Sequence, residues 1–85
     1  MTKQHEVESL AFEGDWMTLG VDQQVYRLPL AQVSERLLKA SAADRKIYRI
    51  AASGYGIHWP TLDEDLSIDG LLKLARAQSQ AVETH

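Results

Sequence analysis

The residues best suited to chemistry in this sequence are one histidine and the three acidic residues that follow it. His58 precedes Asp63, Glu64 and Asp65 by five to seven positions. An imidazole and carboxylates are ligands that divalent transition metals accept, and a carboxylate can also orient a histidine as a general base. The spacing straddles Pro60, matches no compact ligand motif, and has no nucleophile motif beside it. We therefore assign no catalytic residue, no metal site and no cofactor, and we expect a protein that is not an enzyme.

The same stretch has a second interpretation, as a surface for another protein. Burial in the core is the default for a tryptophan, for Trp59 as for Trp16. If Tyr55 and Trp59 instead reach the surface, they form an aromatic patch beside the acids. Aromatic side chains with a charged rim are typical of protein–protein contacts. The candidate protein-binding residues are Tyr55, His58, Trp59, Asp63, Glu64 and Asp65.

Basic residues gather in the middle of the chain. Residues 27–49 carry six of them against two acids, whereas residues 57–70 carry four acids and no lysine or arginine. Contacts to phosphates would make the protein a nucleic-acid-binding accessory, and the candidate residues are Arg36, Lys39, Arg45, Lys46 and Arg49. The net charge of −3 and the lack of a recognisable reading helix argue against this alternative. Arg45 has another interpretation, an ion pair with the acids at 63–65.

Length and composition limit the kind of protein. The chain has 85 residues, of which 45% are hydrophobic, and this indicates one small folded domain over residues 1–85. The absence of cysteine excludes disulfides and thiolate metal sites. No apolar run approaches the roughly 20 residues of a membrane span, and the first residues lack the apolar core of a secretory signal. We expect a cytoplasmic protein that does not bind a membrane.

The first third of the chain predicts strands. Apolar residues alternate over residues 7–13, 16–21 and 25–28, which is the period of a half-buried strand. Gly14 suits the first turn, but the second turn has weaker chemistry because no glycine follows Asp22. Strands joined by short turns pair antiparallel. We predict a three-stranded antiparallel meander.

The remainder alternates between helical and extended patterns. Pro29 suits the start of a helix, and apolar residues recur at helical spacing through Lys39. Ser41 and Ser67 are good N-caps for a helical turn at 42–46 and for the closing helix. We prefer a strand to a helix for residues 48–52, and residues 57–59 are extended because a proline follows them. The predicted class is α+β, with a meander, a helical middle, an extended Trp-Pro segment and a C-terminal helix.

These residues carry a resemblance to a known family. The stretch Gly54-x-Gly56-Ile57-His58-Trp59-Pro60-x-Leu62-Asp63-Glu64-Asp65-Leu66-Ser67-x-x-Gly70-Leu71-Leu72 resembles the signature of the domain of unknown function 2442 family. Leu28-Pro29-Leu30-Ala31, Arg36-Leu37 with Ala40, and Arg45 are similar to that family's pattern at matching spacing. The resemblance implies a small bacterial α+β protein without an established biochemical activity.

The resemblance also implies expectations about partners, and this chain departs from the family's pattern at two places. Members can be encoded beside small toxin-like proteins, and some carry an added helix-turn-helix domain. Many members have Asp-Gly where this chain has Asp22-Gln23, which bears on the second turn. Many also have an aromatic residue and a proline where this chain has Gln32-Val33-Ser34, so we expect a longer first helix here.

Two functions from different classes follow from the sequence. The leading one is a small non-catalytic protein-binding domain, and the resemblance adds an antitoxin-like role in a toxin–antitoxin gene pair. Its partner would then be a small protein, such as a toxin encoded nearby. The alternative is the nucleic-acid-binding accessory. The unpaired edge of a small meander also permits a homodimer, and the sequence leaves the oligomeric state open.

Overall fold

The computed structural model describes residues 5–83 and begins with an antiparallel meander. Its strands are β1 (Val7–Glu13), β2 (Trp16–Val21) and β3 (Gln24–Pro29), in that spatial order. The predicted meander is confirmed, and its third strand is one residue longer at each end than the pattern indicated. Two-residue turns join the strands, because Glu13 pairs with Trp16 and Val21 pairs with Gln24.

The second turn forms without the glycine that such turns favour. Asp22 and Gln23 both adopt a left-handed backbone, with φ of 52° and 67°. This is the geometry of the type I′ turn, which matches the twist of the flanking strands. Two carboxylates support it, since Asp22 accepts a hydrogen bond from the Glu6 N–H at 2.8 Å and Glu8 accepts one from the Gln23 N–H at 3.0 Å. The turn therefore uses local hydrogen bonds in place of glycine.

The helix predicted from Pro29 through Lys39 is wrong in its continuity. The structure has two short helices, α1 (Leu30–Val33) and α2 (Glu35–Lys39), separated at Ser34. Ser34 is extended, and its hydroxyl accepts from the Leu37 N–H at 3.2 Å, so it caps α2. Serine competes for backbone hydrogen bonds in this way, which interrupts a helix. The turn predicted after Ser41 is present as α3 (Ala42–Arg45), with the Ser41 hydroxyl as its cap.

The second half of the chain forms another antiparallel sheet. Its strands are β4 (Arg49–Ile50), β5 (Gly56–Trp59) and β6 (Glu64–Ser67), in that spatial order. The strand preferred for residues 48–52 is present at residues 49–50 alone, whereas the extended segment at 57–59 is confirmed. The acids at 63–65 do not simply lead into a helix, because residues 64 and 65 belong to β6. A four-residue turn from Pro60 to Asp63 connects β5 to β6.

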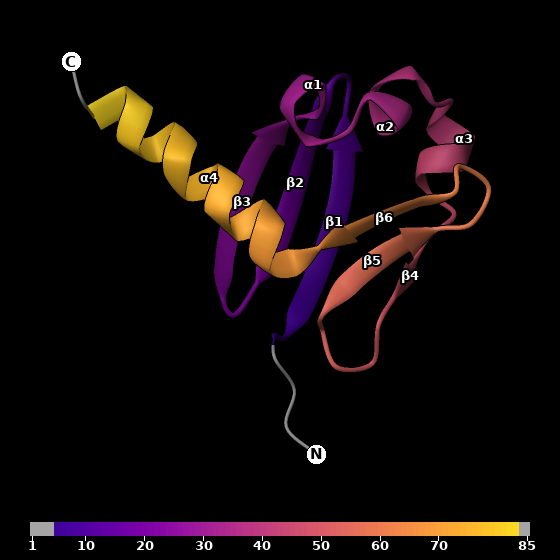
Figure 1. The fold of residues 1–85 in the computed structure, drawn as a ribbon, viewed down its shortest axis with the longest axis horizontal. Coiled ribbons are helices and arrows are strands. Elements are labelled where there is room, and N and C mark those ends of the chain that lie inside the picture. The colour runs from indigo at the N-terminus through magenta and orange to yellow at the C-terminus, as the bar shows by residue number, and fades with distance from the viewer. Residues whose placement is uncertain (1–4, 84–85) are drawn as a thin grey trace.

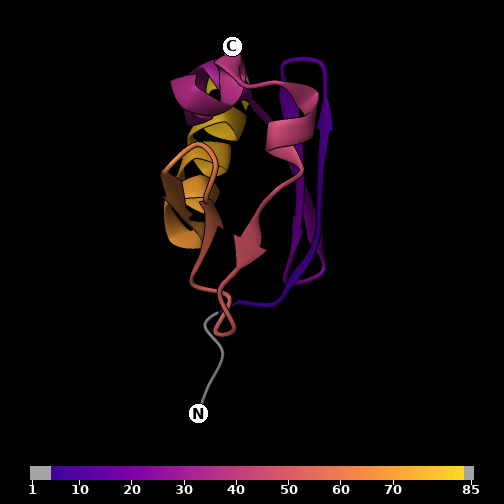
Figure 2. The same ribbon diagram turned by 90° about the vertical axis from the view of Figure 1, so that its right-hand side faces the viewer.

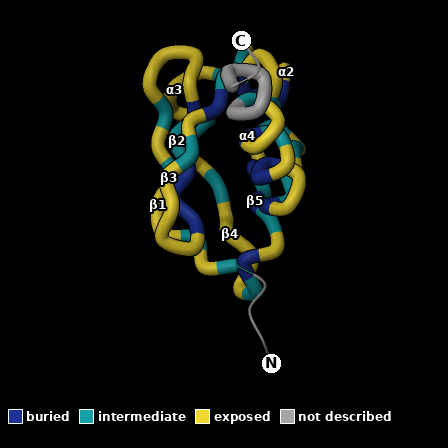
Figure 3. The backbone as a smooth tube through the Cα atoms, turned by 90° about the vertical axis from the view of Figure 1, so that its left-hand side faces the viewer, coloured by how far each residue is buried: buried dark blue, intermediate teal, exposed yellow. Residues whose placement is uncertain are grey.

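The closing helix α4 (Ile68–Glu83) completes the fold. The predicted cap is confirmed, since the Ser67 hydroxyl accepts from the Gly70 N–H at 3.0 Å. Figures 1 and 2 show two layers, with the meander on one side and α4 with the second sheet on the other. The buried stretches lie on the facing sides of these layers (Figure 3). No helix between residues 5 and 83 is long and apolar enough to cross a bilayer.

The two tryptophans differ in their surroundings. Trp59 has no exposed surface and packs against Tyr48, with ring centroids 6.1 Å apart. Trp16 is 38% exposed and lies on the outer face of the meander, where the Arg27 guanidinium stacks 4.5 Å from its ring centroid. The default of burial is therefore right for Trp59 and wrong for Trp16, because the face that Trp16 occupies is covered by no other element among residues 5–83.

Candidate functional site

The outer face of the second sheet carries a row of polar side chains. Arg49, His58 and Asp65 lie opposite one another on β4, β5 and β6. Side chains alternate along a strand, so His58 points away from the core while its neighbours Ile57 and Trp59 are buried. The His58 Nδ1 and an Asp65 carboxylate oxygen are 2.7 Å apart. Both side chains are open to solvent, at 42% and 75% exposure.

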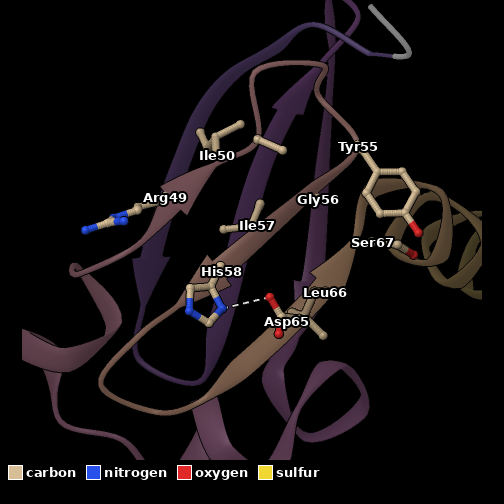
Figure 4. A pocket seen from close by; sticks show the side chains of 10 residues that line it. Arg49, Ile50, Tyr55, Gly56, Ile57, His58, Asp65, Leu66 and Ser67 are labelled. Atoms are coloured by element: carbon tan, nitrogen blue, oxygen red, sulfur yellow. Dashed lines mark hydrogen bonds and ion pairs between the residues drawn. The ribbon is translucent and has the colours of Figure 1, made fainter.

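An open hollow of about 660 Å³ lies on this face. Figure 4 shows Tyr55 and Ser67 at one end, the His58–Asp65 pair at the other, and Ile50 on the β4 side. Tyr55 is 57% exposed and Ile50 is 38% exposed, and both line the hollow. The hollow therefore combines exposed apolar area with a hydrogen-bonded polar pair.

Three of the six predicted protein-binding residues surround this hollow, namely Tyr55, His58 and Asp65. Asp63 is exposed in the turn before β6, where its backbone carbonyl accepts a hydrogen bond from Arg36. Asp63 has a left-handed φ of 51°, as the last residue of the four-residue turn. These positions put the exposed acids at one end of the second sheet.

The other two predicted residues have structural roles. Trp59 is fully buried, and its indole N–H donates to the Arg45 carbonyl at 3.0 Å. Glu64 accepts a hydrogen bond from the Ser34 hydroxyl, which ties β6 to the start of α2. The condition that Trp59 reach the surface is not met, and exposed Tyr55 lies at the opposite end of the hollow from Asp65.

The His58–Asp65 pair has the form of a carboxylate that orients an imidazole. Ser67 lies in the same hollow, but its hydroxyl is committed as the N-cap of α4. The pair is also exposed to water, whereas acid–base sites gain strength from water exclusion. Within the described residues, no three His, Asp or Glu side chains lie close enough to hold a metal ion together. The exposed pair is open to hydrogen bonding with a ligand from solvent.

The basic segment is largely used inside the molecule. Arg45 donates three hydrogen bonds to backbone carbonyls, to Leu37 and Leu38 at 2.9 Å and to Gly14 at 2.8 Å. The predicted ion pair between Arg45 and the acids at 63–65 is wrong. The last carbonyls of a helix have no partner within that helix, and Arg45 satisfies those of α2 while also binding the first turn of the meander.

The other basic residues differ in whether their side chains bond to other groups of the molecule. Arg36 donates to the Asp63 carbonyl, and Lys39 lies 3.8 Å from Glu35 across one helical turn. Lys46 and Arg49 are exposed on different elements, one after α3 and the other on β4. Of the five candidate residues, Arg45 is thus half-buried with its guanidinium bonded to carbonyls, whereas the other four are exposed.

The sequence pattern gave no sign of a cluster around His5. Its Nδ1 is 2.8 Å from Asp22 and its Nε2 is 2.7 Å from Asp69, so both ring nitrogens can donate to carboxylates when the imidazole is protonated. Hydrogen bonds to Asp22 and then to Asp69 raise the pKa of His5 above its usual range. The His5 hydrogen bond, followed by that from the Glu6 N–H, lowers the pKa of Asp22. These residues come from the N-terminal segment, a turn and a helix, and only the fold brings them together.

Comparison with known proteins identifies the family. Residues 7–77 match the family described as "Protein of unknown function (DUF2442)". The chain belongs to the DUF2442 family. A crystal structure of a protein of unknown function from Rhodospirillum rubrum is similar, with a TM-score of 0.65 and 23% identity over 84% of this chain and 88% of that one. That likeness shows a shared fold. No curated protein matches this chain.

The DUF2442 signature stretch from Gly54 to Leu72 builds the hollow. It supplies β5, β6 and the first turn of α4. Gly54 has a φ of +70°, and a Cβ there would lie 1.8 Å from the His5 carbonyl oxygen. A Cβ on Gly56 would lie 2.9 Å from the Leu66 carbonyl oxygen of the neighbouring strand. Both signature glycines are therefore explained by the close approach of a neighbouring backbone, which leaves no room for a Cβ, and not by a phosphate-binding loop.

Proposed function

We propose that this DUF2442 member is a small, non-catalytic, cytoplasmic protein-binding domain that docks its partner on the outer face of the second sheet. The observation that carries the proposal is the open hollow, with exposed Tyr55 at one end and the His58–Asp65 pair at the other. Exposed aromatic and aliphatic anchors with a polar rim are the composition of interface centres. The finer role, that of an antitoxin binding a small toxin encoded nearby, has support only from the family resemblance.

The exposed acids at one end of this face favour a partner with basic residues, and Arg49 on β4 favours an acidic group at the other side of the partner's contact. Asp63 and Asp65 are exposed, and Asp65 keeps most of its carboxylate in water while one oxygen contacts His58. Rim carboxylates steer a basic partner and set its orientation, while the apolar anchors supply most of the affinity. We therefore assign Tyr55 as the main anchor and Asp65 as the main orienting charge.

Co-purification with the product of the adjacent gene tests the proposal. The wild-type chain is expected to retain that protein in stoichiometric amount, and Asp65→Lys with Tyr55→Ala is expected to abolish retention. Asp15→Lys is the matched control, because Asp15 is an exposed acid in the first turn of the meander, on the other layer. Thermal unfolding of each variant separates lost binding from lost folding. Equal retention by the double variant and the control would reject this face.

Nucleic-acid binding is the outcome that would replace the proposal. It predicts retention on DNA or RNA that falls steeply with salt, since bound phosphates release counterions. Lys46→Ala with Arg49→Ala would then weaken retention, because the side chains of these two candidate residues are exposed and make no hydrogen bond or ion pair among the described residues. No retention of nucleic acid at physiological salt, together with capture of the adjacent gene product, supports protein docking.

A further inference from the structure

A second hollow lies between the meander and the segment that contains α3. It encloses about 560 Å³ and shares no lining residue with the hollow on the second sheet. Leu10 and Phe12 of β1 line it from the meander, and Ala42 of α3 and Tyr48 line it from the other segment. Pockets that hold small organic ligands have volumes of about 300–1,000 Å³ and mostly apolar walls. The size and the walls of this hollow therefore suit a small molecule.

The charge of this hollow has one sign. Its charged lining residues are Arg45 and Lys46, and no acidic side chain of the described residues lines it. Glu13 follows Phe12 on β1, so its side chain points to the opposite face of the meander. Neither Arg45 nor Lys46 forms an ion pair with a described carboxylate. A cleft lined by charges of one sign concentrates ions of the other sign, so this hollow attracts anions.

The walls of the hollow are held in place by the rest of the fold. The buried indole of Trp59 donates to the Arg45 carbonyl at 3.0 Å and packs against Tyr48, with ring centroids 6.1 Å apart. The Arg45 guanidinium donates to the Gly14 carbonyl at 2.8 Å and so joins this segment to the first turn of the meander. Figure 2 shows α3 next to the meander. A preformed site of this kind lowers the entropy lost when a ligand binds.

We propose that this hollow binds a small carboxylate with an aromatic or aliphatic body. The carboxylate lies against the Arg45 guanidinium and the Lys46 ammonium group, and the apolar body packs on Leu10, Phe12 and Tyr48. The cations select the charge of the ligand and orient it, while removal of its apolar surface from water supplies most of the affinity. This site is separate from the face on which we propose that a protein partner docks.

The hydrogen-bonding capacity of Arg45 favours a carboxylate over a phosphate. A guanidinium has five N–H donors, and Arg45 uses three of them on the carbonyls of Leu37, Leu38 and Gly14. The two that remain match the two oxygens of a carboxylate, whereas a phosphate group brings three strong acceptor oxygens. The partners of Arg45 are neutral carbonyls, so its positive charge is still available to an anionic ligand.

Titration with naphthalene-2-carboxylate, followed by the amide chemical shifts of the full chain in NMR spectra, tests the proposal. The amides of Phe12, Lys46 and Tyr48 should shift and saturate, whereas those of Gly56 and Ile57, which line the other hollow, should not. The neutral naphthalene-2-carboxamide has the same shape without the charge, and we expect its dissociation constant to be about tenfold higher or more. Equal affinity for the acid and the amide, or shifts centred on the other hollow, would overturn the proposal.

Two variants and a competitor test the assigned residues with the same probe. Lys46→Glu should raise the dissociation constant about tenfold, and Lys73→Glu is the matched control, because Lys73 is exposed on α4 and the change in net charge is the same. An equal loss in both variants would mean that net charge alone attracts the probe, and it would overturn the site.

Ala42→Trp keeps both cations but fills the hollow, since Ala42 is an exposed lining residue, and it should abolish binding without lowering the melting temperature. Unchanged binding by this variant would place the probe elsewhere and refute the proposal. Displacement of the probe by an equal concentration of inorganic phosphate would assign a phosphate site in place of the carboxylate site. Capture of the adjacent gene product should be unaffected by Lys46→Glu, because Lys46 does not line the hollow on the second sheet.

Discussion

Replacing Arg45 by alanine should be among the most destabilising single changes outside the apolar core. The guanidinium holds the carbonyls of Leu37, Leu38 and Gly14 at 2.8–2.9 Å and so joins α2, α3 and the first turn of the meander. A hydrogen bond to a charged group contributes about 1.5–3 kcal/mol, but the half-buried side chain lets water replace part of that. The Leu37 carbonyl also keeps a hydrogen bond from the Ala40 N–H. We expect Arg45→Ala to cost about 2–3 kcal/mol of a total of roughly 5–10 kcal/mol.

Urea unfolding followed by tryptophan fluorescence measures this loss, and a double-mutant cycle identifies its cause. Arg45→Lys should recover less than half of the loss, because an ammonium group cannot meet three carbonyls in one plane. Asp65→Asn combined with Arg45→Ala should show a coupling energy below about 0.5 kcal/mol, as for residues without contact. A coupling of about 1 kcal/mol or more would mean that Arg45 pairs with the acids in solution, and it would refute the carbonyl arrangement.

Three further predictions concern single side chains. Gln23→Gly should stabilise the protein by about 0.5–1 kcal/mol, because Gln23 has a left-handed backbone. Gln24→Gly in β3 should instead destabilise it. The urea midpoints of the two variants, compared with the wild type, show whether each change stabilises or destabilises the fold. Trp59→Phe should lower the free energy of unfolding by about 2–3 kcal/mol, because it leaves a cavity and an unpaired Arg45 carbonyl. Trp16→Phe at the surface should lower it by less than about 1 kcal/mol in the same assay. Because the pKa of His5 is raised in the folded protein, its contacts contribute their full stabilisation below pH 6.5. This contribution is lost as the pH rises through the higher pKa that His5 has in the folded state. The melting temperature of the wild type should therefore exceed that of His5→Gln most at mildly acidic pH, and a constant difference up to pH 9 would contradict the assignment.

Local patterns in the sequence were sufficient for much of the fold. The period of two at 7–13 and 16–21, and the caps at Ser41 and Ser67, depend on neighbouring residues alone, and the structure contains them as predicted. The residue before Pro60 is extended for a steric reason that no distant contact can change. Features that a few adjacent residues determine can be inferred from one sequence.

The misplaced features all depend on residues far apart in the chain. Ser34 interrupts the first helix and also donates to Glu64, thirty positions later. Arg45 donates to backbone carbonyls of α2 and of the first turn. Every residue has a backbone carbonyl, so the sequence does not indicate which ones Arg45 binds. His5 reaches Asp69 across 64 positions. Charge and polarity showed that these side chains need partners, but the identity of each partner follows only from the packing of the two layers.

The unusual composition of the signature stretch has two separate causes in the structure. Gly54 and Gly56 permit close backbone approach, Trp59 fills the core, and Glu64 ties β6 to α2. Tyr55, His58 and Asp65 of the same stretch have solvent-accessible side chains around the open hollow. Tyr55 is the clearest case, because it sits between two constrained glycines yet keeps 57% of its surface exposed. A tyrosine has only two side-chain torsions to fix on binding and so loses little entropy, which favours Tyr55 as the anchor for a partner.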